Sequence, residues 1–128
     1  MSIVFVNPDV IPVFNILVRK NQDTVLLINA KNGSNVALDL TGATISMDVR
    51  EQPYMTGNLH TNFSTTTGGG IVVATDPTTG SFTLTILESA ASGYTWKHGY
   101  FDVKVTFGGG QVLIIGKGEI QIEDGITV

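Results

Sequence analysis

Strict alternation of apolar and polar residues is the feature of this sequence that most narrows the folds open to it. Residues 44–50 alternate at every position, and the same period of two recurs at 81–86, 101–107 and 119–123. Such alternation is typical of a β-strand that turns one face toward a core and the other toward water. Four segments of this kind predict a protein built mainly from half-buried strands.

Less regular segments complete the set of expected strands. They are rich in β-branched and apolar residues, or are short apolar runs bounded by glycine, which favours strands that are buried more deeply. These segments are 14–19, 24–30, 71–74 and 112–115. Residues 88–92 hold the one stretch that could begin a helix, and it would last about one turn before Gly93.

Turn residues separate these segments. Asn32-Gly33 is a strong hairpin signal because both residues tolerate a positive φ angle. The glycines at 108–110 predict that the strands on either side pair, and residues 76–80 predict a turn that precedes the strand at 81–86. Gly116 and Gly118 predict a bulge or bend in the last strand pair.

The spacing of eight or nine strands predicts an all-β fold, specifically an antiparallel two-sheet β-sandwich of immunoglobulin-like type. A jelly roll or a small barrel is the alternative. The expected organisation is an N-terminal arm at 1–12 and a single domain at 13–128. A long loop is expected at 51–70, because twenty residues there lack strong periodicity, and a short edge strand at 58–63 is expected within it.

Composition argues against several classes of function. The 128 residues include no cysteine, so thiolate chemistry and disulfides are excluded. The seven basic residues are scattered and the net charge is −4, which argues against nucleic-acid binding through phosphates. The N-terminus lacks the pattern of a signal peptide, and no apolar run approaches the ~20 residues of a membrane span.

Side chains that could perform catalysis do not form a recognisable constellation in the sequence. The acidic residues of the alternating strands fall on positions expected to face water, namely Asp48, Asp102, Glu119 and Glu123. His60 and His98 lie 38 positions apart without an acidic cluster beside them, and Asp39 is expected to cap its own turn. We therefore expect no catalytic residues, no metal and no cofactor, and no enzyme activity.

One aromatic cluster remains to be interpreted. Tyr94, Trp96, His98 and Tyr100 recur at a period of two, so an extended backbone would place all four on the face opposite Phe101. An exposed aromatic row stacks well on a sugar or anchors a protein partner. The alternative, which we favour, is that Trp96 folds over the end of the sandwich as a lid with Tyr100 beside the neighbouring sheet edge.

Four stretches in order resemble a known family. Residues 39–50 (DLTGATISMDVR) resemble a recurring segment of small tail-associated phage proteins and of the N-terminal domain of phage baseplate upper proteins. Residues 80–86, 99–105 and 116–122 are similar to the later strands of those domains. The resemblance implies an immunoglobulin-like β-sandwich built into a virion, with no catalytic residues to carry over.

The leading hypothesis is a bacteriophage virion structural protein that acts by protein–protein contacts. It would be a tail, baseplate or fibre-anchoring component, or a capsid decoration protein, and it would form a homo-oligomer with other virion proteins as partners. Its contacts would come from strand edges, the arm at 1–12 and the loop residues Tyr54, Met55 and Phe63. The alternative is a carbohydrate-binding module with a glycan platform of Tyr94, Trp96 and Tyr100.

Overall fold

The computed structural model describes residues 2–6, 13–31, 36–52, 56–66 and 68–123. Over these residues the chain folds into nine strands and two short helical turns, η1 (Pro77–Thr79) and α1 (Glu88–Ala91). The strands are β1 (Ser2–Val6), β2 (Ile16–Arg19), β3 (Thr24–Lys31), β4 (Thr44–Gln52), β5 (Thr56–Ser64), β6 (Ile71–Val73), β7 (Ser81–Ile86), β8 (His98–Thr106) and β9 (Val112–Glu123). No helix among the described residues is long and apolar enough to cross a membrane.

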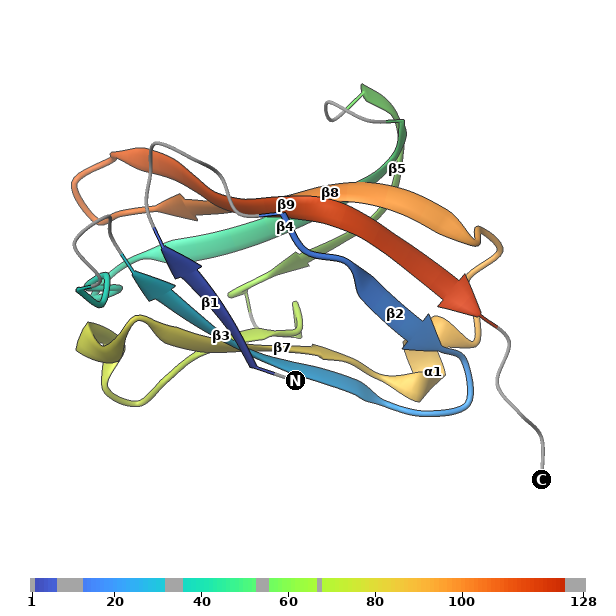
Figure 1. The fold of residues 1–128 in the computed structure, drawn as a ribbon, viewed down its shortest axis with the longest axis horizontal. Helices are drawn as coiled ribbons and strands as arrows, with labels where there is room; N and C mark the ends of the chain where they lie inside the picture. The colour runs from blue at the N-terminus through green and yellow to red at the C-terminus, as the bar shows by residue number, and fades with distance from the viewer. Residues whose placement is uncertain (1, 7–12, 32–35, 53–55, 67, 124–128) are drawn as a thin grey trace.

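The strands form two sheets that face each other (Figure 1). One sheet has four strands in the order β1-β3-β7-β6, and the other has five in the order β2-β9-β8-β4-β5. When β3 to β9 are matched with strands B to G of a variable-type immunoglobulin domain, the orders B-E-D and G-F-C-C′ appear in the two sheets. The predicted β-sandwich is therefore confirmed, and its strand order is compatible with an immunoglobulin-like arrangement.

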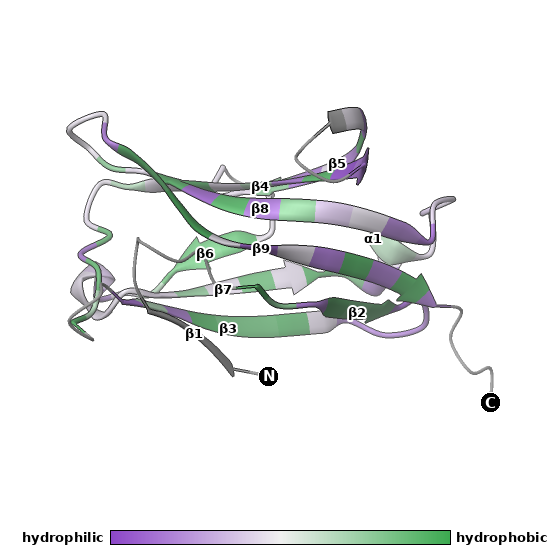
Figure 2. Cartoon of the chain, turned by 45° about the horizontal axis from the view of Figure 1, so that its top comes forward, coloured by the Kyte–Doolittle hydropathy of each residue, from purple (hydrophilic) through white to green (hydrophobic). Residues whose placement is uncertain are grey.

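The core lies between the sheets and is filled by the inward positions of the alternating strands. β7 buries Phe82, Leu84 and Ile86, while β8 buries Phe101 and Val103. No polar or charged residue is buried among the described residues. Figure 2 shows the resulting alternation of hydropathy along the last strand, β9. Burial of these apolar faces is the main force that holds the two layers together.

Several predictions from the sequence are confirmed by the strands and turns. The alternating segment at 81–86 is β7 to the residue, and the helical turn predicted at 88–92 is α1. The glycines at 108–110 join β8 and β9 as an antiparallel pair, and a register shift opposite Gly116 gives the predicted bulge. Because pairing continues past that bulge, the two short strands expected at 112–115 and 119–123 form one strand.

Polar side chains cap two of the predicted turns. The backbone N–H of Thr41 donates to the Asp39 carboxylate at 3.0 Å, as expected for a residue that caps its own turn. Asp76 accepts the N–H of Thr78 at 3.1 Å, and Gly80 ends the turn with a φ of 70°. The predicted Asn32-Gly33 hairpin lies outside the described residues, although an antiparallel bridge joins Lys31 to Ala37.

Most strand pairs are antiparallel, as predicted, and the two N-terminal strands are the exceptions among the named pairs of the described residues. β1 pairs in parallel with β3, and β2 pairs in parallel with β9. Neither pair is connected by a hairpin, so no short loop forces the strands to run in opposite directions. The arm expected at 1–12 is also corrected in part, because Ser2–Val6 is a strand at the edge of its own domain.

The expectation of a long loop at 51–70 is wrong as well. Thr56–Ser64 forms the nine-residue strand β5, which pairs antiparallel with β4 at the edge of the five-stranded sheet. The short edge strand expected at 58–63 lies within it. Two register shifts in this pair, near Val49 and Arg50, break the period of two. That break is the reason why alternation did not reveal the strand.

The N-terminal segment runs alongside the last strand and approaches its backbone closely at Gly118. The N–H of Phe14 donates to the carbonyl of Lys117 at 3.0 Å. A Cβ atom placed on Gly118 would lie 1.6 Å from the Phe14 carbonyl oxygen, so a side chain cannot be accommodated without a shift of the backbone. The ring of Phe14 then packs edge-on against Phe101 at a centroid distance of 5.0 Å.

Candidate functional site

The outer side of the five-stranded sheet carries a concentration of polar and charged side chains. Four of them lie in one register row that crosses β5, β4, β8 and β9: Asn62, Asp48, Asp102 and Lys117. We call this surface the polar face and define it by these four residues together with Arg50 and Tyr100, which are paired in the next row. Alternation along β4 and β8 positions these side chains, because their neighbours in sequence point into the core.

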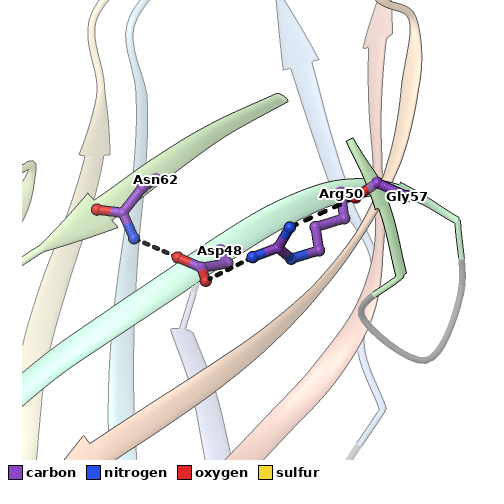
Figure 3. A network of polar contacts seen from close by, with 4 residues as sticks. All are labelled: Asp48, Arg50, Gly57 and Asn62. Carbon is purple, nitrogen blue, oxygen red and sulfur yellow. Dashed lines mark hydrogen bonds and ion pairs between the residues drawn. The ribbon is translucent and has the colours of Figure 1, made fainter. Parts of the chain in front are cut away.

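A hydrogen-bonded network fixes one half of the polar face (Figure 3). The side-chain amide of Asn62 donates to one oxygen of Asp48. The other oxygen of Asp48 lies 3.6 Å from the guanidinium of Arg50, which also donates to the carbonyl of Gly57 at 3.4 Å. Asp48 and Arg50 are both half-buried, so this network orients the two charged groups rather than leaving them free to sample rotamers.

The other half of the polar face sets two carboxylates directly opposite each other. Asp102 on β8 is the cross-strand partner of Asp48 on β4. Burial raises the pKa of the Asp102 carboxyl, and the charge of Asp48 raises this pKa further, while Lys104 and Arg50 act in the opposite sense. Like charges directly opposite in a sheet are destabilising.

This arrangement breaks a local rule of sheet stability in the middle of the sheet. Natural proteins break such rules mainly at functional sites and compensate for the cost elsewhere in the structure. A cationic side chain brought to this row by another protein would offset the repulsion between the two carboxylates. The polar face is for that reason the candidate interaction surface of the chain.

Exposed residues of β8 and β9 extend the polar face toward the end of the sheet. The ring of His98 packs edge-on against that of Tyr100 at 4.9 Å, and His98 Nε2 lies 3.2 Å from a carboxylate oxygen of Glu119. Tyr100, which the aromatic pattern had singled out, therefore belongs to this surface. Half-buried tyrosines with a polar rim are common anchors of protein interfaces.

The four aromatic residues at 94–100 do not form the single row that an extended backbone would give. β8 begins only at His98, and Tyr94 and Trp96 lie in the irregular segment before it, partly buried and packed against the core. His60 of β5 stacks on Trp96 with ring centroids 4.6 Å apart, and Tyr94 stacks on it at 4.9 Å. Burial raises the pKa of Tyr94, and a hydrogen bond to Thr61 opposes this rise.

This packing agrees with the interpretation of Trp96 as a lid over the end of the sandwich. The expected glycan platform of Tyr94, Trp96 and Tyr100 is split, since two of its rings pack on the core while Tyr100 lies on the polar face. A sugar needs coplanar, open rings on one surface for stacking. The observed arrangement does not provide them.

Three residues of the expected loop, Tyr54, Met55 and Phe63, were predicted to contact a partner. Phe63 is only 7% exposed and packs in the core, so its assignment as a surface contact residue is wrong. Its position on β5, opposite the buried Met47, turns its side chain inward. Tyr54 and Met55 lie outside the described residues.

Sequence reasoning placed Asp48 and Asp102 on a solvated face but missed that they meet. Each belongs to a separate alternating strand, and only the register between β4 and β8 brings them together. Among the described residues, no group of three or more histidine, cysteine, aspartate or glutamate side chains is placed to hold a metal ion. The arrangement on the polar face offers charge and hydrogen bonding to a partner.

Comparison with known proteins supports the fold at low sequence identity. No protein-family model matches the sequence, and no curated protein matches it. Among solved structures, the extracellular domains 3–5 of Drosophila OTK match with 12% identity over 87% of this chain and 33% of theirs, at a TM-score of 0.38, which is too low to support an argument.

The N-terminal domain of phage TP901-1 ORF48 gives a fuller match. It covers 96% of this chain and 99% of that domain, with 11% identity and a TM-score of 0.54. The match spans nearly the whole of both chains, so it concerns the domain as a unit and not a shared hairpin. The resemblance to the N-terminal domain of a phage protein, seen first in the sequence motifs, is thus confirmed as a likeness of fold.

Proposed function

We propose that this chain is a structural component of a bacteriophage virion and acts through protein–protein contacts. The observation that carries the proposal is the near-complete match in fold to an N-terminal domain of a phage protein. The motifs at 39–50 and 99–105, which form much of β4 and β8, support it independently because they resemble phage tail-associated proteins. The resemblance of these motifs to tail-associated proteins supports a location in the tail of the particle.

The polar face is the surface that we assign to the contact with another virion protein. Its outward groups are mixed in sign, and Asp48, Arg50, Tyr100 and Asp102 are half-buried, which is typical of interfaces that form between separately folded proteins. The Asp48–Asp102 row would receive an arginine or lysine of the partner, since such a group relieves the repulsion between the two carboxylates. Tyr100 would pack beside that group as an aromatic anchor.

The presence of the chain in particles tests the proposed role. Gradient-purified virions would be digested and analysed by mass spectrometry with isotope-labelled peptides of this chain as standards. We expect a fixed number of copies per particle, small compared with that of the major capsid protein. Absence from intact particles, with the chain present in the infected cell, would contradict the proposal.

The assignment of the polar face is tested by charge reversal. Asp102→Arg is expected to reduce incorporation into particles at least tenfold, because it replaces an attractive contact with a repulsive one. Glu51→Arg makes the same change in charge at an exposed position outside the register row and is expected to incorporate normally. Asp102→Asn, which is expected to fold well, should give an intermediate loss; equal incorporation of all three would exclude the polar face.

A further inference from the structure

The outer side of the four-stranded sheet has a chemistry opposite to that of the polar face. Its exposed apolar residues are Val25 at 52%, Leu27 at 43% and Val72 at 69% exposure. Between them, Thr85 lies opposite Val25, and Thr83 lies opposite both Leu27 and Val72. We call this surface the neutral face and define it by these five residues. Figure 2 shows β3 as hydrophobic along most of its length.

The middle of this sheet carries no ionisable group at the described outward positions. Asn29 and Ser81 continue the neutral face toward one end and are hydrogen-bonded to each other. At the far edge, Ser2 and Val4 of β1 occupy the register positions beside Leu27 and Asn29. An uncharged row that spans several strands is unusual for a sheet face in contact with water, where charged residues are the common choice.

Charges reappear at the two ends of β3, and they differ in sign. Lys31 lies at the C-terminal end of the strand. Asp23 and Glu88 lie together at the other end, where the Asp23 carboxylate accepts the N–H of Glu88 at 2.8 Å. The neutral face is thus bordered by a positive end and a negative end, about 27 Å apart over the stretch from Asp23 to Lys31 at roughly 3.4 Å per residue.

We propose that the neutral face binds a second copy of this chain across a two-fold axis that makes the facing β3 strands antiparallel. In that orientation Lys31 of each copy approaches Asp23 and Glu88 of the other, while the uncharged rows meet in the middle. A chain of net charge −4 repels its copies through a charged surface, and this face avoids the repulsion. The inference is independent of the proposed virion role.

The size of the face sets the strength of the association. The neutral face lies on β3, β7 and the three-residue strand β6, which at about 4.8 Å between strands gives a footprint of at most roughly 15 by 20 Å. That is less than half of the ~800 Å² per partner that a stable complex buries, so the dimer is weak. It forms at high protein concentration in solution, or where a symmetric assembly holds copies side by side and raises their effective concentration.

A dilution series of the full chain tests the surface without any substitution. Amide ¹H–¹⁵N spectra recorded from about 10 μM to about 1 mM should show concentration-dependent shifts that cluster on β3, β6 and β7. Sedimentation velocity over the same range should show the sedimentation coefficient rise toward that of a dimer. Constant spectra, or shifts that cluster on β4 and β8, would overturn the proposal.

Substitutions then test the mode of pairing. Leu27→Asp is expected to weaken association at least tenfold, whereas Leu59→Asp, at a similarly exposed leucine of β5, should leave it unchanged. Lys31→Glu and Glu88→Lys should each weaken self-association, and an equimolar mixture of the two should restore it, because only the mixed dimer pairs opposite charges at both ends. A mixture no stronger than the separate variants would exclude the antiparallel arrangement.

Discussion

At the scale of single residues, Asp102 carries an unfavourable electrostatic interaction that distinguishes the polar face. Its carboxyl has a raised pKa in the folded protein because of burial and because Asp48 lies opposite. The folded state therefore binds a proton at Asp102 more tightly than the unfolded state does. The protein is therefore destabilised by this carboxyl as the pH rises through the pKa of the folded state. Below 3.8, the pKa of the unfolded state, this destabilisation is absent.

Asp102→Asn should accordingly raise the free energy of unfolding at pH 7, by up to about 1 kcal/mol. The gain should shrink as the pH is lowered toward 4, where the natural carboxyl takes up its proton. Urea unfolding at several pH values measures both effects. Glu119→Gln, on the same outer side but paired with His98, should give no gain; a lower stability of Asp102→Asn at pH 7 would contradict this account.

A substitution at Gly118 tests the close approach between the backbone of Phe14 and β9. Gly118→Ala would place its Cβ atom against the Phe14 carbonyl oxygen and is expected to cost about 2 kcal/mol of stability. Gly109→Ala is the matched control, since a Cβ atom there meets nothing within 4 Å. Thermal unfolding of the two variants should differ clearly. Equal thermal unfolding midpoints for the two variants would mean that Phe14 does not lie against β9 in solution.

Phe63 distinguishes a strand from the loop that its sequence indicated. Because it is buried opposite Met47, Phe63→Ala should cost about 3 kcal/mol or more through lost burial and the cavity left behind. Leu59→Ala, on the same strand but 49% exposed, should change stability by less than about 0.5 kcal/mol. A similarly small loss of stability in both variants would mean that Phe63 is not buried in the core.

At the scale of elements, β1 lies at the edge of the four-stranded sheet and pairs there with β3. Deletion of residues 1–6 should therefore reduce stability by on the order of 1 kcal/mol, as backbone hydrogen bonds are lost. It should also increase light scattering at high concentration, because the edge of β3 is uncovered. Unchanged unfolding and scattering would show that the segment does not pair with β3.

Comparison of the predicted with the observed strands shows which structural features one sequence is able to predict. Residues 81–86 predicted β7 because alternation continued without interruption, and Gly116 predicted the bulge because a glycine within a strand pattern has few other uses. β5 was predicted only as a short edge strand at 58–63, because two register shifts break its period. The aromatic residues at 94–100 are split because residues 94–97 are irregular and the strand begins only at His98, which the spacing of the side chains does not reveal.

Register is the property that strand patterns lack altogether. The sequence places Asp48 and Asp102 on outward positions, yet only the pairing of β4 with β8 makes them neighbours. The neutral face arises in the same way, since Val25, Leu27 and Val72 come from two strands that β7 separates. The fold class could therefore be predicted, whereas the two surfaces that carry the functional proposals required the structure.

At the scale of the whole molecule, the sandwich presents two outer faces of different chemistry. The polar face suits a different protein of opposite local charge, and the neutral face suits a second copy of the chain. Because the two faces lie on opposite sides of the domain, a pair of copies joined through their neutral faces presents a polar face to a partner on each of its two outer sides. Such an arrangement fits a component that is repeated by symmetry in a particle.

The central claim is that the chain is built into a virion through its polar face, and side-chain footprinting tests it most directly. Hydroxyl radicals would label the free chain and the chain in purified particles, and mass spectrometry would compare the oxidation of each residue. We predict that His98 and Tyr100, at the polar face, lose most of their reactivity in the particle, while Leu87, which is exposed and lies outside the polar face, keeps it. Unchanged reactivity of His98 and Tyr100 in particles that contain the chain would contradict the claim.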